Sequence, residues 1–242
     1  ETDYRETSLN NRPLWRPNKL RAADRNITHF MREVSSRWGV DVPDYGTLHK
    51  WSVNHREDFW TTVWDFCDVR SDTRGEIILR NGDSMLGAEW FPEARLNFAE
   101  NLLRGEGSEP AIIFWGEDRI KRTLSCDDLR NQVSQLQQAL QAAGVNPGDR
   151  VAGYLPNLPE TVIAMLATTS LGAVWSSCSP DFGVQGVLDR FSQIDPKILF
   201  VADGYFYGGK EFDCLVRVKA VTAQLPSVSQ LVVVPYLSLI HI

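Results

Sequence analysis

Hydrophobic positions between residues 123 and 236 follow two alternating periods. Short apolar runs typical of buried strands are separated by longer stretches in which apolar residues recur every three or four positions, as in amphipathic helices. The expected strands are 150–155, 173–177, 197–202 and 230–234. The expected helices are 126–143, 159–170, 184–194 and 211–224. This alternation predicts an α/β fold with a doubly wound, largely parallel sheet and crossover helices.

The region before this pattern is expected to be helical and rich in tryptophan. Asp24 and Thr47 are good caps for two helices, and Gly39 is expected to end the first of them. Pro92 is expected to begin a further helix. Four of the eight tryptophans lie between positions 51 and 90. They could line a ligand pocket, but aromatic residues at helical spacing favour a core or an interface between domains.

Two local sequence patterns predict the structure between these two regions. Apolar runs at 111–115 and 119–124 flank a short polar turn that contains Gly116, which predicts a β-hairpin. Ser125 follows directly, with Asp128 three residues later, and this pair predicts a variant of the helix capping box.

Composition and charge narrow the possible partners and compartments. The net charge of −6 gives no electrostatic reason to propose nucleic acid or an anionic membrane as a partner. No apolar run reaches the roughly 18 residues that a membrane span requires. The cysteines, Cys67, Cys126, Cys178 and Cys214, are far apart and form no C-x-x-C pair. Reduced thiols and a cytoplasmic location are therefore expected.

The two ends of the sequence differ from those of a typical complete domain. The first residue is not Met, and residues 237–242 (LSLIHI) form neither a polar tail nor a capped element. We expect the chain to be a fragment of a longer protein, with these last residues as a tail that does not belong to the fold. The alternative is a genuine C-terminal edge strand.

The segment Gly204–Glu211 nearly matches the phosphate loop of nucleotide hydrolases, G-x-x-x-x-G-K-[ST]. Glu211 stands where that motif needs a hydroxyl for Mg²⁺, and its carboxylate would repel triphosphate oxygens. The residues Tyr205–Tyr207 are also bulky for a loop that must wrap phosphates. A true phosphate loop of this type is therefore disfavoured. A structural turn remains possible, as does another kind of phosphate-contacting loop in which Lys210 supplies one positive charge.

The segment Cys178–Gly183 follows an expected strand, at the edge where doubly wound sheets bind ligands. Pro180 and Gly183 also make an ordinary strand-to-helix turn, and the residues alone favour that interpretation. The four histidines form no catalytic constellation, and G-x-S-x-G, H-E-x-x-H and G-x-G-x-x-G are absent from the sequence. Serine-hydrolase, zincin and simple dehydrogenase activities are therefore excluded, and no catalytic or metal-binding residue is assigned.

Motifs along the chain occur in the order found in adenylate-forming acyl-CoA synthetases. Residues 123–203 contain a helix that leads into GVNPGDRV, a strand that ends in LPN, and then the runs ETVIAMLA and LGAV. Earlier segments are similar to the acetoacetyl-CoA synthetase branch, namely LWRPN, HFM, WSVNHREDFW and WFPEARLNFAENLL. The resemblance runs from about residue 13 to 236 and is specific, because no single motif carries it.

The resemblance implies an incomplete large N-terminal domain of an adenylate-forming enzyme. Residues 1–104 would be its helical N-terminal region and 105–236 the first part of its AMP-binding domain. The longer protein would be an acid–thiol ligase that makes acetoacetyl-CoA from acetoacetate, ATP and coenzyme A, with Mg²⁺, through an acyl-adenylate. The family's Ser/Thr/Gly-rich phosphate loop and lid lysine are not visible in this sequence, so the chain alone is expected to be inactive.

The resemblance also implies a coenzyme A site. In related enzymes the loop after the strand that ends at Cys178 approaches this ligand, which assigns Ser179, Pro180 and Asp181. The next loop places basic residues near the nucleotide 3′-phosphate, which assigns Tyr207, Gly208, Gly209 and Lys210. Tyr207 departs from the basic residue expected there, whereas Lys210 keeps a cation.

Other interpretations stay open. A short-chain acyl-CoA synthetase for acetate, propionate or butyrate would share these motifs, because the residues of the acyl pocket lie mostly downstream in the family. A non-catalytic binding module of the same fold is the alternative from another class.

Overall fold

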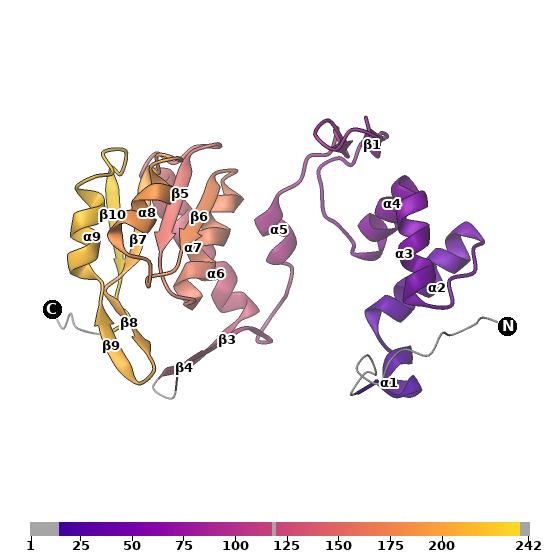
Figure 1. The fold of residues 1–242 in the computed structure, drawn as a ribbon, viewed down its shortest axis with the longest axis horizontal. Helices are drawn as coiled ribbons and strands as arrows, with labels where there is room; N and C mark the ends of the chain where they lie inside the picture. The colour runs from indigo at the N-terminus through magenta and orange to yellow at the C-terminus, as the bar shows by residue number, and fades with distance from the viewer. Residues whose placement is uncertain (1–14, 118–119, 238–242) are drawn as a thin grey trace, which may run out of the picture. The chain divides into compact units, whose positions relative to one another are not determined.

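The computed structural model describes residues 15–117 and 120–237 (Figure 1). The chain divides into two compact units, Glu1–Arg95 and Leu96–Ile242. Most of the tail expected at the C-terminus, residues 238–242, lies outside the described residues, as do residues 1–14.

The first unit is helical. Its elements are α1 (Lys19–Ala23), α2 (Asn26–Trp38), α3 (Tyr45–Asn54), α4 (Arg56–Phe66) and the short antiparallel pair β1 (Leu79–Arg80) and β2 (Glu89–Trp90). The core contains Phe30, Val34, Val42, Leu48 and Trp51. The helical stripe thus contributes Trp51 to a core, whereas the rings of Trp60 and Trp90 are partly exposed and 5.6 Å apart.

Local capping in this unit differs from the sequence-based expectation. Asp44, not Thr47, caps α3, because its carboxylate accepts a hydrogen bond from the backbone N–H of Thr47 at 2.7 Å. Asp24 is the C-cap of α1, and Arg25 precedes α2 without a side-chain cap. Gly39 ends α2 as expected, with φ at 66°, a conformation that glycine adopts without steric cost.

The second unit begins with a short helix, α5 (Phe98–Leu102). The expectation that Pro92 begins the helix here is wrong. Pro92 lies in a turn, and the helix starts only after Asn97, whose side-chain oxygen accepts from the backbone N–H of Glu100 at 3.1 Å. The hairpin expected next is present as β3 (Pro110–Gly116) and β4 (Ile120–Ser125).

The centre of this unit is a parallel sheet of four strands in the order β10-β7-β5-β6 (Figure 1). The strands are β5 (Arg150–Tyr154), β6 (Val174–Cys178), β7 (Ile198–Ala202) and β10 (Gln230–Val234). Each lies within one residue of its expected position, so the predicted doubly wound α/β fold is confirmed.

Helices cover both faces of this sheet. They are α6 (Cys126–Ala142), α7 (Pro159–Ser170), α8 (Val184–Phe191) and α9 (Leu215–Thr222). All five residues of β7 are buried. Ile198 and Phe200 pack in one cluster with residues of α6 and α7, whereas Leu199 and Val201 pack in a second cluster with residues of α8 and α9. Burial on both faces explains why β7 is continuously apolar.

Two expected helices are shorter than predicted, and one of them, α8, ends at Phe191 instead of residue 194. Residues Gly204–Tyr207 (β8) and Lys210–Asp213 (β9) pair as an antiparallel hairpin, so α9 begins at Leu215 instead of Glu211. Within the described residues, none of the helices combines the length and the apolar character that crossing a membrane requires.

The capping box at the start of α6 is confirmed. The Ser125 hydroxyl accepts from the Asp128 N–H at 3.0 Å, and the Asp128 carboxylate accepts from the Ser125 N–H at 3.1 Å. The side-chain and backbone hydrogen bonds from Ser125 lower the pKa of Asp128 below the usual value for an aspartic acid. A depressed pKa contributes stability above the unfolded-state pKa, and this contribution is lost as the pH falls through the folded-state pKa.

Replacing this cap should destabilise the chain measurably. Ser125→Ala is expected to lower the free energy of unfolding by about 1 kcal/mol, because it leaves an N-terminal N–H without its acceptor. Ser134→Ala, on an exposed position inside the same helix, is the matched control and should change little. Urea unfolding followed by far-UV circular dichroism measures both variants. At a pH well below 3.8, where Asp128 is protonated, the difference in unfolding free energy between Ser125→Ala and the parent should shrink. Equal unfolding free energies of Ser125→Ala and Ser134→Ala at pH 7 would contradict the role of the cap.

Candidate functional site

The strand order creates a topological switch point between β5 and β7. The chain leaves β5 toward α7, which packs on one face of the sheet, and leaves β7 through the β8–β9 hairpin toward α9, which packs on the other. In open α/β sheets the crevice outside the carboxyl ends of the strands at such a point is where ligands bind. The described part of the chain has a cavity at this edge.

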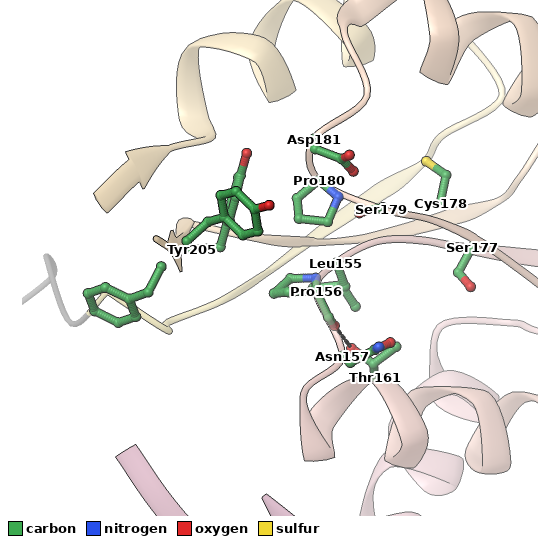
Figure 2. A pocket seen from close by; sticks show the side chains of 12 residues that line it. Leu155, Pro156, Asn157, Thr161, Ser177, Cys178, Ser179, Pro180, Asp181 and Tyr205 are labelled. Carbon is green, nitrogen blue, oxygen red and sulfur yellow. Dashed lines mark hydrogen bonds between the residues drawn. The ribbon is translucent and has the colours of Figure 1, made fainter. Parts of the chain in front are cut away.

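The cavity has a volume of about 530 Å³ and is formed by three segments of the chain (Figure 2). One segment follows β5, one spans the end of β6 and the loop after it, and one is β8. The lining residues are Leu155, Pro156, Asn157, Thr161, Ser177, Cys178, Ser179, Pro180, Asp181, Tyr205, Phe206 and Tyr207.

Hydrogen bonds fix the first two segments. The carbonyl of Pro156 accepts from the hydroxyl of Thr161 at 2.7 Å, a bond drawn in Figure 2, and from the N–H of Leu158 at 2.8 Å. The N–H of Leu155 donates to the carbonyl of Cys178 at 3.3 Å, which extends the pairing of β5 with β6 by one step. The backbone that lines the cavity is therefore held by the same ladder as the sheet.

The lining is polar and aromatic, and its chemistry suits binding better than covalent catalysis. Ser177 and Ser179 are exposed hydroxyls, and Asp181 is an exposed carboxylate. Cys178 is 7% exposed, and burial raises its pKa to about 11. Its sulfur is therefore a neutral thiol near pH 7 and a poor nucleophile.

The hairpin supplies an aromatic wall. The rings of Tyr205 and Phe212 stack across its two strands, with centroids 5.1 Å apart and planes at 13°. Tyr207, by contrast, is 73% exposed at the cavity rim. The pairing of Tyr207 with Lys210 closes the hairpin around Gly208 and Gly209.

This geometry gives the Gly-Gly pair a structural explanation. Gly208 and Gly209 have φ values of 59° and 74°, the positive values that both central residues of a type I′ turn need. The N–H of Gly209 donates to the carboxylate of Glu117 at 3.2 Å. A loop that wraps a triphosphate must join a strand to a helix, whereas this segment joins two antiparallel strands, so the Walker-type interpretation is excluded.

The structure brings most of the sequence-predicted site residues to one place. Ser179, Pro180, Asp181 and Tyr207 line the cavity. Gly208, Gly209 and Lys210 are exposed at the tip of the hairpin and are not among the lining residues.

Sequence reasoning missed the segment after β5 and most of the aromatic wall. The sequence predicts Pro156 and Asn157 only as the end of a strand, and Thr161 only as part of a helix. It marks Tyr205 and Phe206 only as too bulky for a phosphate loop. A signal was available in the Gly-Gly pair flanked by aromatic and apolar residues, which is typical of a hairpin.

The described residues offer no metal centre. In 15–117 and 120–237, no group of three or more His, Cys, Asp or Glu side chains lies close enough together to hold a metal ion. The Asp181 carboxylate is the one acidic group among the lining residues of the cavity.

Comparison with known proteins places the chain in a family. The AMP-binding enzyme family matches residues 98–239, which is more than half of the chain, and the acetyl-coenzyme A synthetase N-terminus matches residues 45–102. The chain therefore belongs to the AMP-binding enzymes. This finding confirms the resemblance carried by the motifs.

Similarity to individual proteins is consistent with membership of this family. An acetoacetyl-coenzyme A synthetase of Rhizobium meliloti (strain 1021) is 52% identical over 225 residues, which are 93% of this chain and 34% of that protein. An acetoacetyl-CoA synthetase of Xenopus tropicalis is 39% identical over 227 residues, covering 92% of this chain and 33% of that protein. The structure of an acetoacetyl-CoA synthetase from Streptomyces lividans matches with a TM-score of 0.89 at 42% identity, covering 96% of this chain and 36% of that one. The chain thus spans about a third of the length of these relatives.

The hairpin turn yields a direct test of the structural explanation for its glycines. Gly208→Val should open the hairpin, because a branched side chain at positive φ costs about 1–2 kcal/mol. Gly208→Asn is the matched control, since asparagine tolerates this conformation in type I′ turns. Hydrogen exchange of the amides of residues 204–213 should accelerate in the valine variant and stay close to the parent in the asparagine variant. Equal exchange in the two variants would show that the positive φ is not what selects glycine here.

Proposed function

We propose that the full-length protein is an acetoacetate–CoA ligase and that the cavity at the carboxyl edge of the sheet forms part of its coenzyme A site. The observation that carries this proposal is the position of the cavity in a chain that is similar in sequence to a known ligase. The cavity lies at the ligand-binding edge of a doubly wound sheet, within a chain 52% identical over 93% of its length to an acetoacetyl-coenzyme A synthetase.

The chemistry of such a ligase has two steps. A carboxylate oxygen of acetoacetate attacks the α-phosphorus of ATP, which forms acetoacetyl-adenylate and releases pyrophosphate. The sulfur of coenzyme A, having given up its proton, then attacks the acyl carbon, and the acyl–phosphate bond breaks to release AMP. The first step is needed because a free carboxylate is a poor electrophile, whereas AMP is a good leaving group.

The cavity suits the second substrate. Coenzyme A combines a nucleotide that carries phosphate groups with a long arm of two amides and a terminal thiol. The hydroxyls of Ser177 and Ser179 and the aromatic rings of β8 can contact such an arm and a nucleotide base. Asp181 would repel phosphate and Lys210 would attract it, so the phosphate groups belong toward the tip of the hairpin, beside Gly208 and Gly209.

ATP and Mg²⁺ are proposed as the remaining cofactors of the full-length enzyme. When bound, Mg²⁺ would neutralise phosphate charge during the first step. The described residues do not fit a Mg²⁺ site, because they gather no cluster of three candidate ligands. No described residue is therefore assigned to Mg²⁺ or to ATP, and no catalytic residue is assigned in this chain.

One observation favours a second candidate substrate. The match of residues 45–102 to the acetyl-coenzyme A synthetase N-terminus keeps acetate, and with it propionate and butyrate, as alternative acids for the same two steps. The four cysteines are thiols and not disulfide-bonded, which fits the cytoplasmic location proposed for the enzyme.

The full-length protein should release pyrophosphate and consume coenzyme A only when a suitable acid is present. We expect kcat/KM for acetoacetate to exceed that for butyrate by at least about tenfold, because a pocket that contacts the C3 carbonyl is left with an unpaired polar group by the analogue. Butyrate is the matched control, since it has the same chain length without that carbonyl. Preference for acetate, propionate or butyrate would favour the alternative ligase, and no acid-dependent pyrophosphate release would favour a non-catalytic module. The present chain alone should show no pyrophosphate exchange.

A further inference from the structure

The loop between β6 and α8, residues Ser179–Gly183, has few hydrogen bonds of its own. Its internal backbone bond joins the N–H of Phe182 to the carbonyl of Ser179 at 3.2 Å. The loop nevertheless carries three lining residues of the cavity, Ser179, Pro180 and, next to them, Asp181. Outside the loop, the guanidinium of Arg190 in α8 lies 4.1 Å from the centroid of the Phe182 ring, and a further contact comes from the sheet itself.

Tyr154 makes that contact. It is the last residue of β5, the strand that pairs with both β6 and β7, and it is 1% exposed. Its hydroxyl lies 2.9 Å from the carbonyl oxygen of Pro180 and 2.7 Å from that of Phe182. A side chain on the central part of the sheet thus reaches two backbone groups of the loop.

The hydrogen bonds of this contact can have only one direction, with the tyrosine hydroxyl as the donor. Both partners are carbonyl oxygens, which can only accept, so the tyrosine must donate, and its single hydrogen is shared in a three-centre hydrogen bond. Burial raises the pKa of Tyr154 to about 12, so the hydroxyl keeps its hydrogen at neutral pH.

Packing prevents the ring from leaving this position. Tyr154 belongs to the cluster that α8 and α9 form on one face of the sheet, together with Val187 and Phe191 of α8 and Val218 of α9. The ring is therefore fixed by apolar contacts, and the hydroxyl by its two acceptors. Ser179 and Asp181 remain exposed on the loop, whereas Pro180 between them is buried.

We propose that Tyr154 is a positioning residue for the thiol substrate, which holds the Ser179–Gly183 loop in the form that lines the cavity. This role rests on the proposed function of the cavity as part of the coenzyme A site. Tyr154 does not line the cavity itself, so it acts through the loop and not by contact with the ligand.

The test is Tyr154→Phe in the full-length protein, a change that keeps the ring and removes only the hydroxyl. The KM for coenzyme A should rise about five- to tenfold, the equivalent of one neutral hydrogen bond. The kcat and the KM for ATP should stay close to the parent values. Tyr45→Phe is the control, because it removes the same hydroxyl from an exposed residue of α3 that is not among the lining residues of the cavity, and all constants should be unchanged.

Hydrogen exchange distinguishes a local effect from a loss of fold. Faster exchange confined to residues 179–183 in Tyr154→Phe supports the proposal. Faster exchange throughout the unit, no change in the loop, or equal changes in the KM for coenzyme A and for ATP would overturn it. An activity assay of the parent enzyme tests the proposed function independently of the role of Tyr154. If it forms no coenzyme A thioester with any acid, the proposed function fails, and the exchange data still report whether Tyr154 holds the loop.

Discussion

The parallel pairing of β5 with both β6 and β7 is the constraint on which the rest of the second unit depends. Its register aligns Tyr154 with Cys178 on one side and with Val201 on the other. Three strands therefore end at the same edge of the sheet, and the segments that follow them are brought together although they are far apart in sequence. The cavity is a consequence of that alignment, because each strand end contributes one of its walls.

The alignment is stable because both faces of the sheet are covered. Side chains of β7 alternate between two apolar clusters, one shared with α6 and α7 and one with α8 and α9. A shift of register by one residue would move each side chain into the other cluster, where it would not fit the packing. Tyr154 links this core to the edge that holds the cavity, because its ring packs in one cluster and its hydroxyl donates to carbonyls of the loop that lines the cavity.

Much of the fold could be predicted from the sequence, since its strongest signals are local. Continuous apolar runs marked β5 and β7, and the Ser125–Asp128 pair marked the start of α6. The errors occurred where a nearby residue competes for the same role. Asp44 caps α3 instead of Thr47, and Asn97 begins α5 instead of Pro92.

The hairpin and the cavity were harder to predict because both depend on contacts across the chain. Residues 210–213 can form a helix on propensity, but pairing with β8 and the stack of Tyr205 on Phe212 decide for a strand. Ser179, Pro180 and Asp181 were assigned through a family resemblance. Nothing local to Pro156 or Thr161 indicates that they would lie across a cavity from them.

The most direct measurement is a crystal structure of the full-length protein with coenzyme A bound. The ligand should lie at the carboxyl edge of the sheet. Its arm should contact residues 177–181, and its phosphate groups should lie toward Lys210 at the tip of the β8–β9 hairpin. Coenzyme A bound with no contact to residues 177–181 or to the hairpin would contradict the assignment of this cavity.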